Sequence, residues 1–112
     1  MEYPLCDRTV TVYRQTQEQV LRQVVHGCYF QQSDTLQTDA AGSRRKRAFL
    51  LVMPGSVQRV FPGDRVMAGE GPTVSTQQWA RFIPALVPGL SQVGQVKCCY
   101  WQGKLCHTEA TQ

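Results

Sequence analysis

The stretch RTVTVYR at residues 8–14 decides the fold, because it alternates strictly between residue types and is rich in β-branched side chains. A period of two with this composition predicts a half-buried β-strand. A polar connection at residues 15–19 follows, and the apolar-rich segment at residues 20–30 predicts the returning strand. Gly27 inside that segment predicts a bulge or a close approach of another backbone. The chain therefore starts with an antiparallel hairpin.

Short strands separated by turn signals make up most of the remaining chain. Four further strands are expected at residues 48–53, 64–69, 93–101 and 104–110. Gln102-Gly103 predicts a two-residue hairpin between the last two of them. About six strands with no internal repeat predict a mainly β chain, folded as a small antiparallel β-barrel or sandwich in a single domain over residues 1–112.

One short helix is expected after residue 74. Ser75 is a suitable N-cap, and Gln78 three residues later completes a capping box. Trp79 and Phe82 share a face of this helix, and Pro84 ends it. We expect Trp79 and Phe82 to cover the open end of the barrel rather than to stack on bases.

The positive charge of the chain is concentrated at one place. Arg44, Arg45, Lys46 and Arg47 account for the whole net charge of +4, since the other eight cations match the eight acidic residues. They close a polar stretch at residues 31–47, which has almost no large apolar side chain and predicts a long, projecting basic loop. Such a cluster attracts anions over about 8 Å at physiological salt. The alternative is a loop whose charges are simply solvated.

Catalytic patterns are weak. Only the fold could bring His26 to a cysteine, while Cys106 and His107 are neighbours on one strand and face apart. Asp64 and Glu70 stand next to turns, where Asp favours hydrogen bonds to its own backbone. The glycines at 69 and 71 lack the lysine of a phosphate-binding loop. We therefore expect no enzyme activity and no cofactor.

Five cysteines, an odd number without framework spacing, favour a reducing compartment and free thiols that pack as small apolar residues. A zinc site from Cys98, Cys99, Cys106 and His107 is conceivable. However, adjacent residues of a strand point to opposite faces, so Cys98 and Cys99 do not easily share one metal. We expect no metal site.

The order of motifs resembles a family of minor structural proteins of tailed phages and prophages. The resemblance rests on VTVYR at 10–14, VVHGCYF at 24–30, PGDRVMAG at 62–69 and HTEA at 107–110, arranged around the long loop and the Trp79 helix. In particular, the chain looks like a head–tail connector of the head-closure, or stopper, type.

That resemblance implies a non-enzymatic virion protein of the neck region, present in the host cytoplasm during assembly and not bound to a membrane. It implies a homo-oligomeric ring that joins the portal and adaptor to the tail, with the long loop closing the DNA channel. Mapped by position, Arg44, Arg45, Lys46 and Arg47 would contact genomic DNA without sequence preference, or an acidic neighbour. The resemblance also makes Trp79 and Phe82 interface candidates, on a helix that covers the barrel or meets an adjoining ring. A tail-completion or tail-terminator protein, or a small SH3-like or OB-like nucleic-acid-binding module, are the alternatives.

Overall fold

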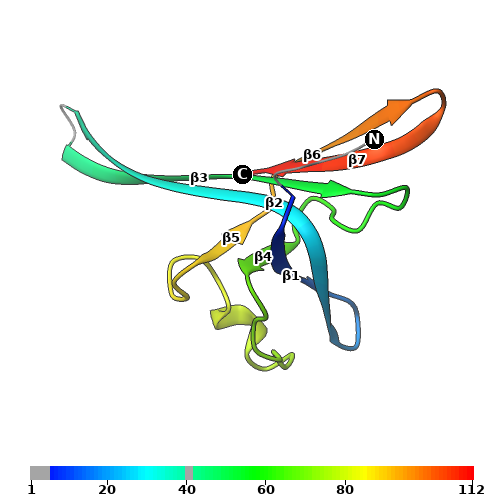
Figure 1. The fold of residues 1–112 in the computed structure, drawn as a ribbon. Helices are drawn as coiled ribbons and strands as arrows, with labels where there is room; N and C mark the ends of the chain where they lie inside the picture. Colours follow the sequence, from blue (N-terminus) through cyan, green and yellow to red (C-terminus); the bar gives the residue numbers. More distant parts are fainter. Residues whose placement is uncertain (1–5, 40–41) are drawn as a thin grey trace.

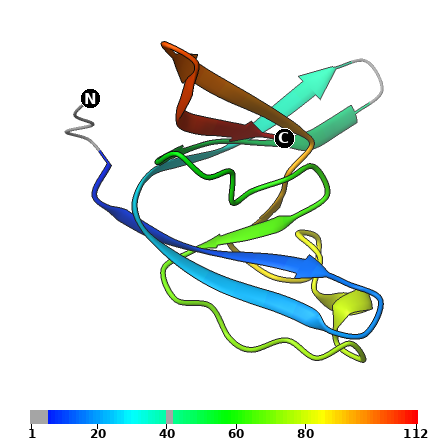
Figure 2. The same ribbon diagram turned by 90° about the vertical axis from the view of Figure 1, so that its right-hand side faces the viewer.

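The computed structural model describes residues 6–39 and 42–112, with side chains described for 6–33 and 48–112. The described chain is mainly β, as expected, and contains one curled, antiparallel seven-stranded sheet that forms a half-barrel, and one short 3₁₀ helix (Figures 1 and 2). The elements are β1 Arg8–Gln15, β2 Val20–Asp39, β3 Gly42–Pro54, β4 Arg65–Ala68, η1 Trp79–Arg81, β5 Leu90–Gln92, β6 Gln95–Trp101 and β7 Lys104–Thr111. Their order across the sheet is β5-β4-β1-β2-β3-β7-β6.

The expected first hairpin is confirmed, because β1 pairs antiparallel with β2 from Gln15↔Val20 to Arg8↔Cys28. The pairing shifts register between Arg8 and Val10, opposite Gly27, whose φ of 74° is left-handed. Gly27 therefore forms the predicted bulge. Immediately beyond it, β2 leaves β1 and pairs with β3 instead, from Tyr29↔Val52 onward.

The structure does not contain the long loop that was expected at residues 31–47. Residues 31–39 continue β2, and residues 42–47 begin β3, paired in register up to Asp39↔Gly42. Sequence composition misses this because strand propensity depends on context, and an established antiparallel ladder extends through polar residues once its inner end is fixed. The 20-residue strand β2 and its partner β3 project from the rest of the molecule (Figure 1).

The turns that were predicted from glycine are also confirmed. Gly63 has a φ of 91°, and the Asp64 N–H donates to the Phe61 carbonyl at 3.1 Å, which closes the turn before β4. Gln102 and Gly103 both have positive φ, at 52° and 78°, as a type I′ hairpin between β6 and β7 requires. The three-residue strand β5 was not expected, so the described residues form seven strands rather than about six.

The two hydrogen bonds of the predicted capping box form, but Ser75 is not the N-cap of the helix. The helix is shorter than expected, and its N-cap is Gln78, which makes no side-chain cap hydrogen bond. The Gln78 N–H donates to Ser75 Oγ at 3.2 Å, and the Ser75 N–H donates to Gln78 Oε1 at 3.0 Å. Only a three-residue 3₁₀ turn, η1, follows. Pro84 disfavours helical backbone at the residue before it, in agreement with the end of η1 at Arg81. The expected helix is shortened at its start, since η1 begins at Trp79.

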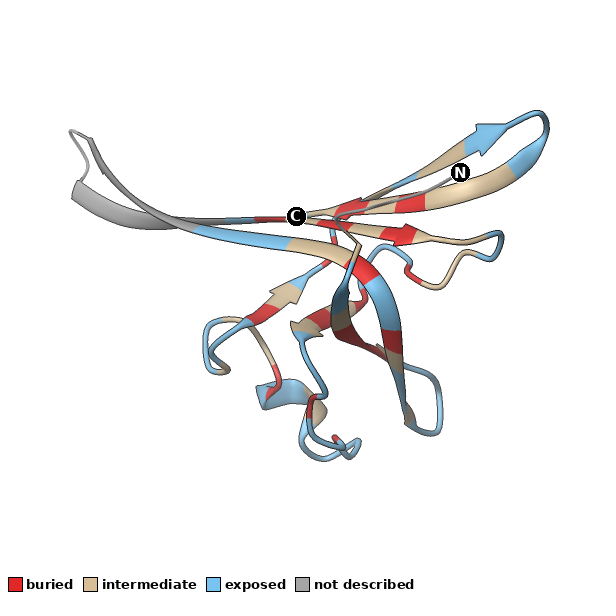
Figure 3. Cartoon of the chain, viewed as in Figure 1, coloured by how far each residue is buried: buried red, intermediate tan, exposed pale blue. Residues whose placement is uncertain are grey.

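Two apolar clusters form the core of the described chain. The buried positions, red in Figure 3, recur along the strands and in the segments that connect them. The larger one includes Val10, Leu51 and Val66, all fully buried, and the smaller one centres on Tyr13 and Phe82. The Tyr13 and Phe82 rings meet edge to face with centroids 4.6 Å apart.

A two-pronged ion pair ties β1 to the turn before β4. Arg14 donates to both carboxylate oxygens of Asp64, at 2.8 and 2.7 Å, and its guanidinium lies 4.3 Å from the centroid of the Phe61 ring. Asp64 is only 2% exposed, and it also accepts the Phe61 N–H at 2.9 Å. The expectation that Asp64 bonds to its own turn is therefore confirmed, and the hydrogen bond to Asp64 raises the pKa of Arg14.

Candidate functional site

The outer part of the β2–β3 hairpin, residues 32–39 and 42–49, is the first candidate site; we call it the arm. Its eight residue pairs run from Gln32↔Phe49 to Asp39↔Gly42. No other described strand pairs with these residues, since β7 pairs with β3 only from Leu50 to Pro54. At about 3.4 Å per residue the arm extends roughly 25 Å.

The basic cluster lies on the arm at known register positions. Arg47 is opposite Asp34, Lys46 opposite Thr35, Arg45 opposite Leu36 and Arg44 opposite Gln37. Alternation along a strand assigns positions 44 and 46 to one face of the ribbon and positions 45 and 47 to the other. The four side chains themselves lie outside the described residues. The cluster is therefore a band on a two-stranded ribbon, instead of the end of a loop.

The root of the arm is attached to the body. Gln32 Nε2 donates to the Gly89 carbonyl at 3.0 Å and to Ser91 Oγ at 2.9 Å. The Phe30 and Phe49 rings pack with centroids 6.1 Å apart, and Phe49 is buried. Beside this root a cavity of about 350 Å³ opens between β3 and β5, lined in part by Phe49, Leu90 and Val93. The arm thus leaves the body at a fixed position.

Trp79 and Phe82 were expected at an interface or over the open end of the barrel. Phe82 is 7% exposed and belongs to the smaller core cluster, so it packs in the core of this chain and is not exposed for an interface. Trp79 is half-buried and stacks under the guanidinium of Arg65, 3.8 Å from the ring centroid. Arg65 also donates to the Trp79 and Phe82 carbonyls, both at 2.7 Å, and burial lowers its pKa. Arg65 thereby caps η1, and the Trp79 and Phe82 rings pack in the smaller core cluster.

A pair of exposed aromatic residues was missed by the sequence reasoning. Tyr100 and Trp101 are 65% and 63% exposed at the end of β6, next to the Gln102-Gly103 turn. Large rings that flank a two-residue hairpin turn lie at its tip, where no third strand covers them. That position, available from the sequence, is the signal that could have identified them.

The titratable residues that were considered for catalysis lie apart or are engaged structurally. The His26 ring shares a 2.9 Å hydrogen bond with Thr9 Oγ1 on the exposed side of the first hairpin. Asp64 is held by Arg14, whereas Glu70 is exposed. Among the described residues, the cluster that brings metal-binding side chains together is Cys99, His107 and Glu109.

The cysteines occupy different environments. Cys28 is fully buried, and burial raises the pKa of its thiol to about 11. Cys6, Cys98, Cys99 and Cys106 are half-buried, so the expectation of buried thiols holds for Cys28 alone. Cys98 donates to Gln58 Oε1 at 3.4 Å, while Cys99 lies near His107, which confirms that the adjacent thiols face opposite ways.

Comparison of the chain with protein-family models, with curated proteins and with solved structures found no match. In the part of the chain that the structure describes, no helix has the length and apolar character needed to cross a membrane.

Proposed function

We propose that the chain is a non-enzymatic virion structural protein: a head–tail connector subunit of the stopper type, whose ring joins the portal and adaptor to the tail and gates the DNA channel. The observation that carries this proposal is the arm. Beyond its root at Gln32 and Phe49, the arm pairs with no third described strand. It carries four cations at consecutive register positions and two aspartates, Asp34 and Asp39, which leaves a net charge of +2 (four minus two) on the arm. Selection for folding alone does not require such an element.

The shape of the molecule supports assembly. The radius of gyration is 15.2 Å, compared with about 13 Å for a compact domain of this length. The accessible surface is 7,524 Å², and it exceeds the roughly 6,200 Å² of a typical monomer of this mass by about 1,300 Å². An excess of this size is comparable to the area that specific protein interfaces bury.

The sheet has two free edges that suit a ring. Within the described chain, β5 lies at one edge and β6 at the other, and the two edges differ in length and sequence. A ring needs head-to-tail contacts between two different surfaces of each subunit. Edge strands left open in a monomer are commonly paired or covered by neighbours. The subunit thus offers a distinct surface on each side.

A ring would bring the basic clusters of many copies together around one axis and so raise the local positive charge. Each copy adds an arm of net charge +2, four cations less Asp34 and Asp39, at the same distance from the axis, so the positive charge that a collar of arms presents to a polyanion in the channel grows with the number of copies. Contacts to phosphate carry no sequence information, as expected for a protein that must hold any genome segment.

The experiment is native mass spectrometry and electron microscopy of the purified chain, alone and mixed with portal and adaptor proteins. We expect closed rings in the mixture, and salt-sensitive DNA binding by the rings that exceeds binding by the monomer. Changing Arg44, Arg45, Lys46 and Arg47 to Gln should remove this DNA binding and leave ring formation intact. A matched variant that changes the exposed Arg8, Arg81, Lys97 and Lys104 to Gln removes the same charge from the body and should retain it. A chain that stays monomeric with both partners present would overturn the proposal.

One observation favours a second function, binding of single-stranded nucleic acid by a free monomer. Tyr100 and Trp101 are exposed near Lys104, and aromatic rings beside cations provide stacking platforms for bases. This function predicts that the monomer binds single strands and that Trp101→Ala weakens binding more than the arm variant does. The connector predicts the reverse order.

A further inference from the structure

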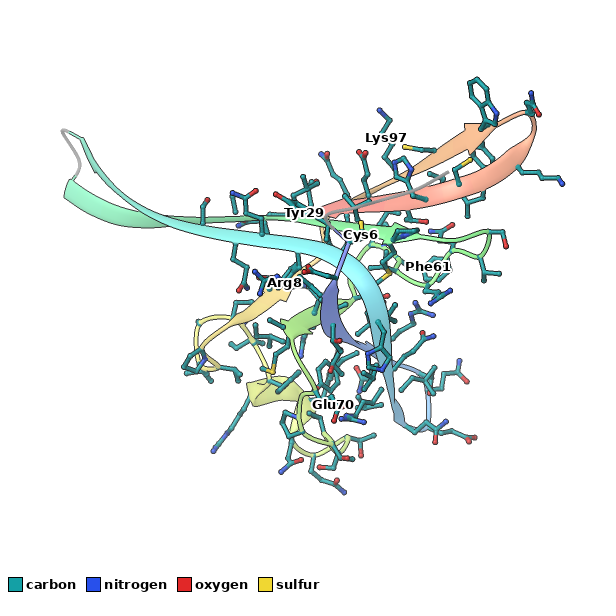
Figure 4. All side chains as sticks on the ribbon, in the orientation of Figure 1. Cys6, Arg8, Tyr29, Phe61, Glu70 and Lys97 are labelled. Carbon is teal, nitrogen blue, oxygen red and sulfur yellow. The ribbon has the colours of Figure 1, made fainter. Side chains whose placement is uncertain are left out.

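The outer face of the β6–β7 hairpin carries a cluster that the connector role does not use. On β7, Thr108 and Ala110 are buried against the core, so His107 and Glu109 belong to the opposite, outer face. On β6, Cys99 is the cross-strand partner of His107, and Lys97 is the partner of Glu109. Lys97 marks this outer face in Figure 4.

Three different ligand types converge there. The Cys99 sulfur, a His107 ring nitrogen and a Glu109 carboxylate oxygen all lie within 4.8 Å of one another. His107 Nε2 and Glu109 Oε1 are already 3.2 Å apart. Ligand atoms of a tetrahedral zinc site, at 2.0–2.3 Å from the metal, are about 3.3–3.8 Å apart. Side-chain adjustments of about an ångström therefore suffice to enclose an ion.

The backbone beneath this cluster is fixed. Strand β7 is paired on both sides, with β3 and with β6, so His107 and Glu109 stand on an inner strand of the sheet. A register shift between Cys99 and Tyr100 places Cys106 outside the regular ladder. The Cys106 carbonyl accepts the Gly55 N–H at 2.9 Å, which anchors this irregularity to the end of β3. Bulges of this kind often re-aim side chains next to functional sites.

The donor set matches zinc in charge and in softness. A thiolate and a carboxylate neutralise the two charges of the ion, and a neutral imidazole adds the third donor. A structural contact between His107 and Glu109 alone would not need a thiol opposite them. The sequence-based objection to zinc concerned Cys98 and Cys99 together, and it does not apply here because Cys98 bonds to Gln58 on the inner face.

We propose that Cys99, His107 and Glu109 form a binding site for a divalent transition-metal ion, with zinc as the ion that the donors suit best. Three protein ligands leave the fourth position of a tetrahedral ion to water or to a donor from another chain. Binding requires the Cys99 thiol to lose its proton, so metal uptake releases a proton and weakens as pH falls. The proposal does not depend on ring formation and holds for the monomer.

The first test is titration of the chelator-treated chain with cobalt(II), followed by displacement with zinc. We expect one equivalent of cobalt to give the near-ultraviolet absorption of a thiolate–cobalt bond and the intense visible bands of tetrahedral coordination, both lost on adding zinc. Cys99→Ser should abolish the thiolate band, and His107→Gln or Glu109→Gln should weaken zinc binding by more than about tenfold, the lower end of the loss seen even for outer partners of such sites. Absence of the thiolate band in the wild-type chain would overturn the proposal.

Matched variants separate this site from adventitious binding by the other thiols. Cys98→Ser and Cys106→Ser remove neighbouring thiols and should keep the cobalt spectrum unchanged; loss of the band in either of them, with Cys99→Ser unaffected, would also overturn the assignment. Because a ligand variant could misfold, circular dichroism accompanies each titration. A second measurement uses the wild-type chain alone: zinc should protect Cys99 from alkylation, read by peptide mass spectrometry, while the alkylation of Cys106 continues at its metal-free rate.

Discussion

The inner and outer parts of the β2–β3 hairpin share the same two strands but differ in their neighbouring strands and in their burial. In the inner part, β3 is bordered by β2 and β7, and Leu51 and Met53 are buried in the core. In the arm the same strands pair only with each other among the described elements, and the sequence becomes polar and basic. A two-stranded ribbon is at best marginally stable in water, so the arm depends on its root. The difference teaches that the inner part is held by a third strand and by the buried core, whereas beyond Gln32 and Phe49 the described pairing of the arm is with its own partner strand alone.

The largest effect is expected where β3 crosses the core. Leu51→Ala removes a fully buried side chain and should lower the free energy of unfolding by about 2–5 kcal/mol. Urea denaturation followed by circular dichroism measures it. Lys46→Ala on the same strand is the control, with an expected change below about 0.5 kcal/mol. Equal losses at both positions would remove the distinction between body and arm.

Alkaline pH should destabilise the body through Cys28. Burial raises the pKa of this thiol from 9.0 to about 11, so the unfolded chain loses its proton first. The stabilisation is complete below about pH 9 and is lost as pH rises toward 11, by at most about 2–3 kcal/mol. Urea denaturation across this range should show a steeper loss for the wild type than for Cys28→Ala. Parallel curves for the two proteins would show that Cys28 does not cause the loss.

A smaller effect is expected at the bulge where β2 changes partners. Gly27→Ala forces a side chain into left-handed backbone and should cost about 1–2 kcal/mol. The added Cβ meets no crowding, since the Cys6 carbonyl oxygen is 3.9 Å away, so the strain is conformational. Gly27→Asn should recover part of the loss in thermal unfolding, because asparagine tolerates this conformation better. If the asparagine variant is as unstable as the alanine variant, strain is not the cause.

The smallest effect on stability is expected from the arm. Changing Arg44, Arg45, Lys46 and Arg47 together to Gln should shift the free energy of unfolding by less than about 0.5 kcal/mol. In contrast, the log–log salt dependence of DNA binding by rings should flatten by about 0.9 for each phosphate contact removed. Binding isotherms at several salt concentrations measure this slope. A large loss of stability with an unchanged slope would assign the cluster to folding.

Much of the fold was predictable because strand alternation and turn residues indicate the same element boundaries. Alternation in β1, the positive-φ glycines and the Ser75–Gln78 hydrogen bonds each formed as their residue types require. The arm was not predictable as a strand pair, because its composition resembles a loop and its pairing depends on the inner ladder. The three-residue β5 is too short to give a period. The sheet order also escapes local patterns, since it pairs segments far apart in the chain, such as β1 with β4.

The candidate sites were predictable in identity more than in geometry. The basic cluster is visible in the sequence, but its position on an extended ribbon follows only from the register of Arg47 with Asp34 and its neighbours. Phe82 looked available for contacts because helical spacing does not reveal which face the core covers. The pairing of Cys99 with His107 depends on a bulge at Cys106, and no residue type in this segment predicts that bulge.

The uninterrupted course of β2 has a mechanical consequence. The strand runs from Val20 to Asp39 with Gly27 as its single glycine, and that glycine lies where the strand passes from β1 to β3. Between that bulge and the arm, β2 contains no further glycine, and Gln32 ties the root of the arm to Gly89 and Ser91. We therefore expect a displacement of the arm to be taken up at two points, the hydrogen bonds of Gln32 and the left-handed backbone of Gly27, before it reaches β1.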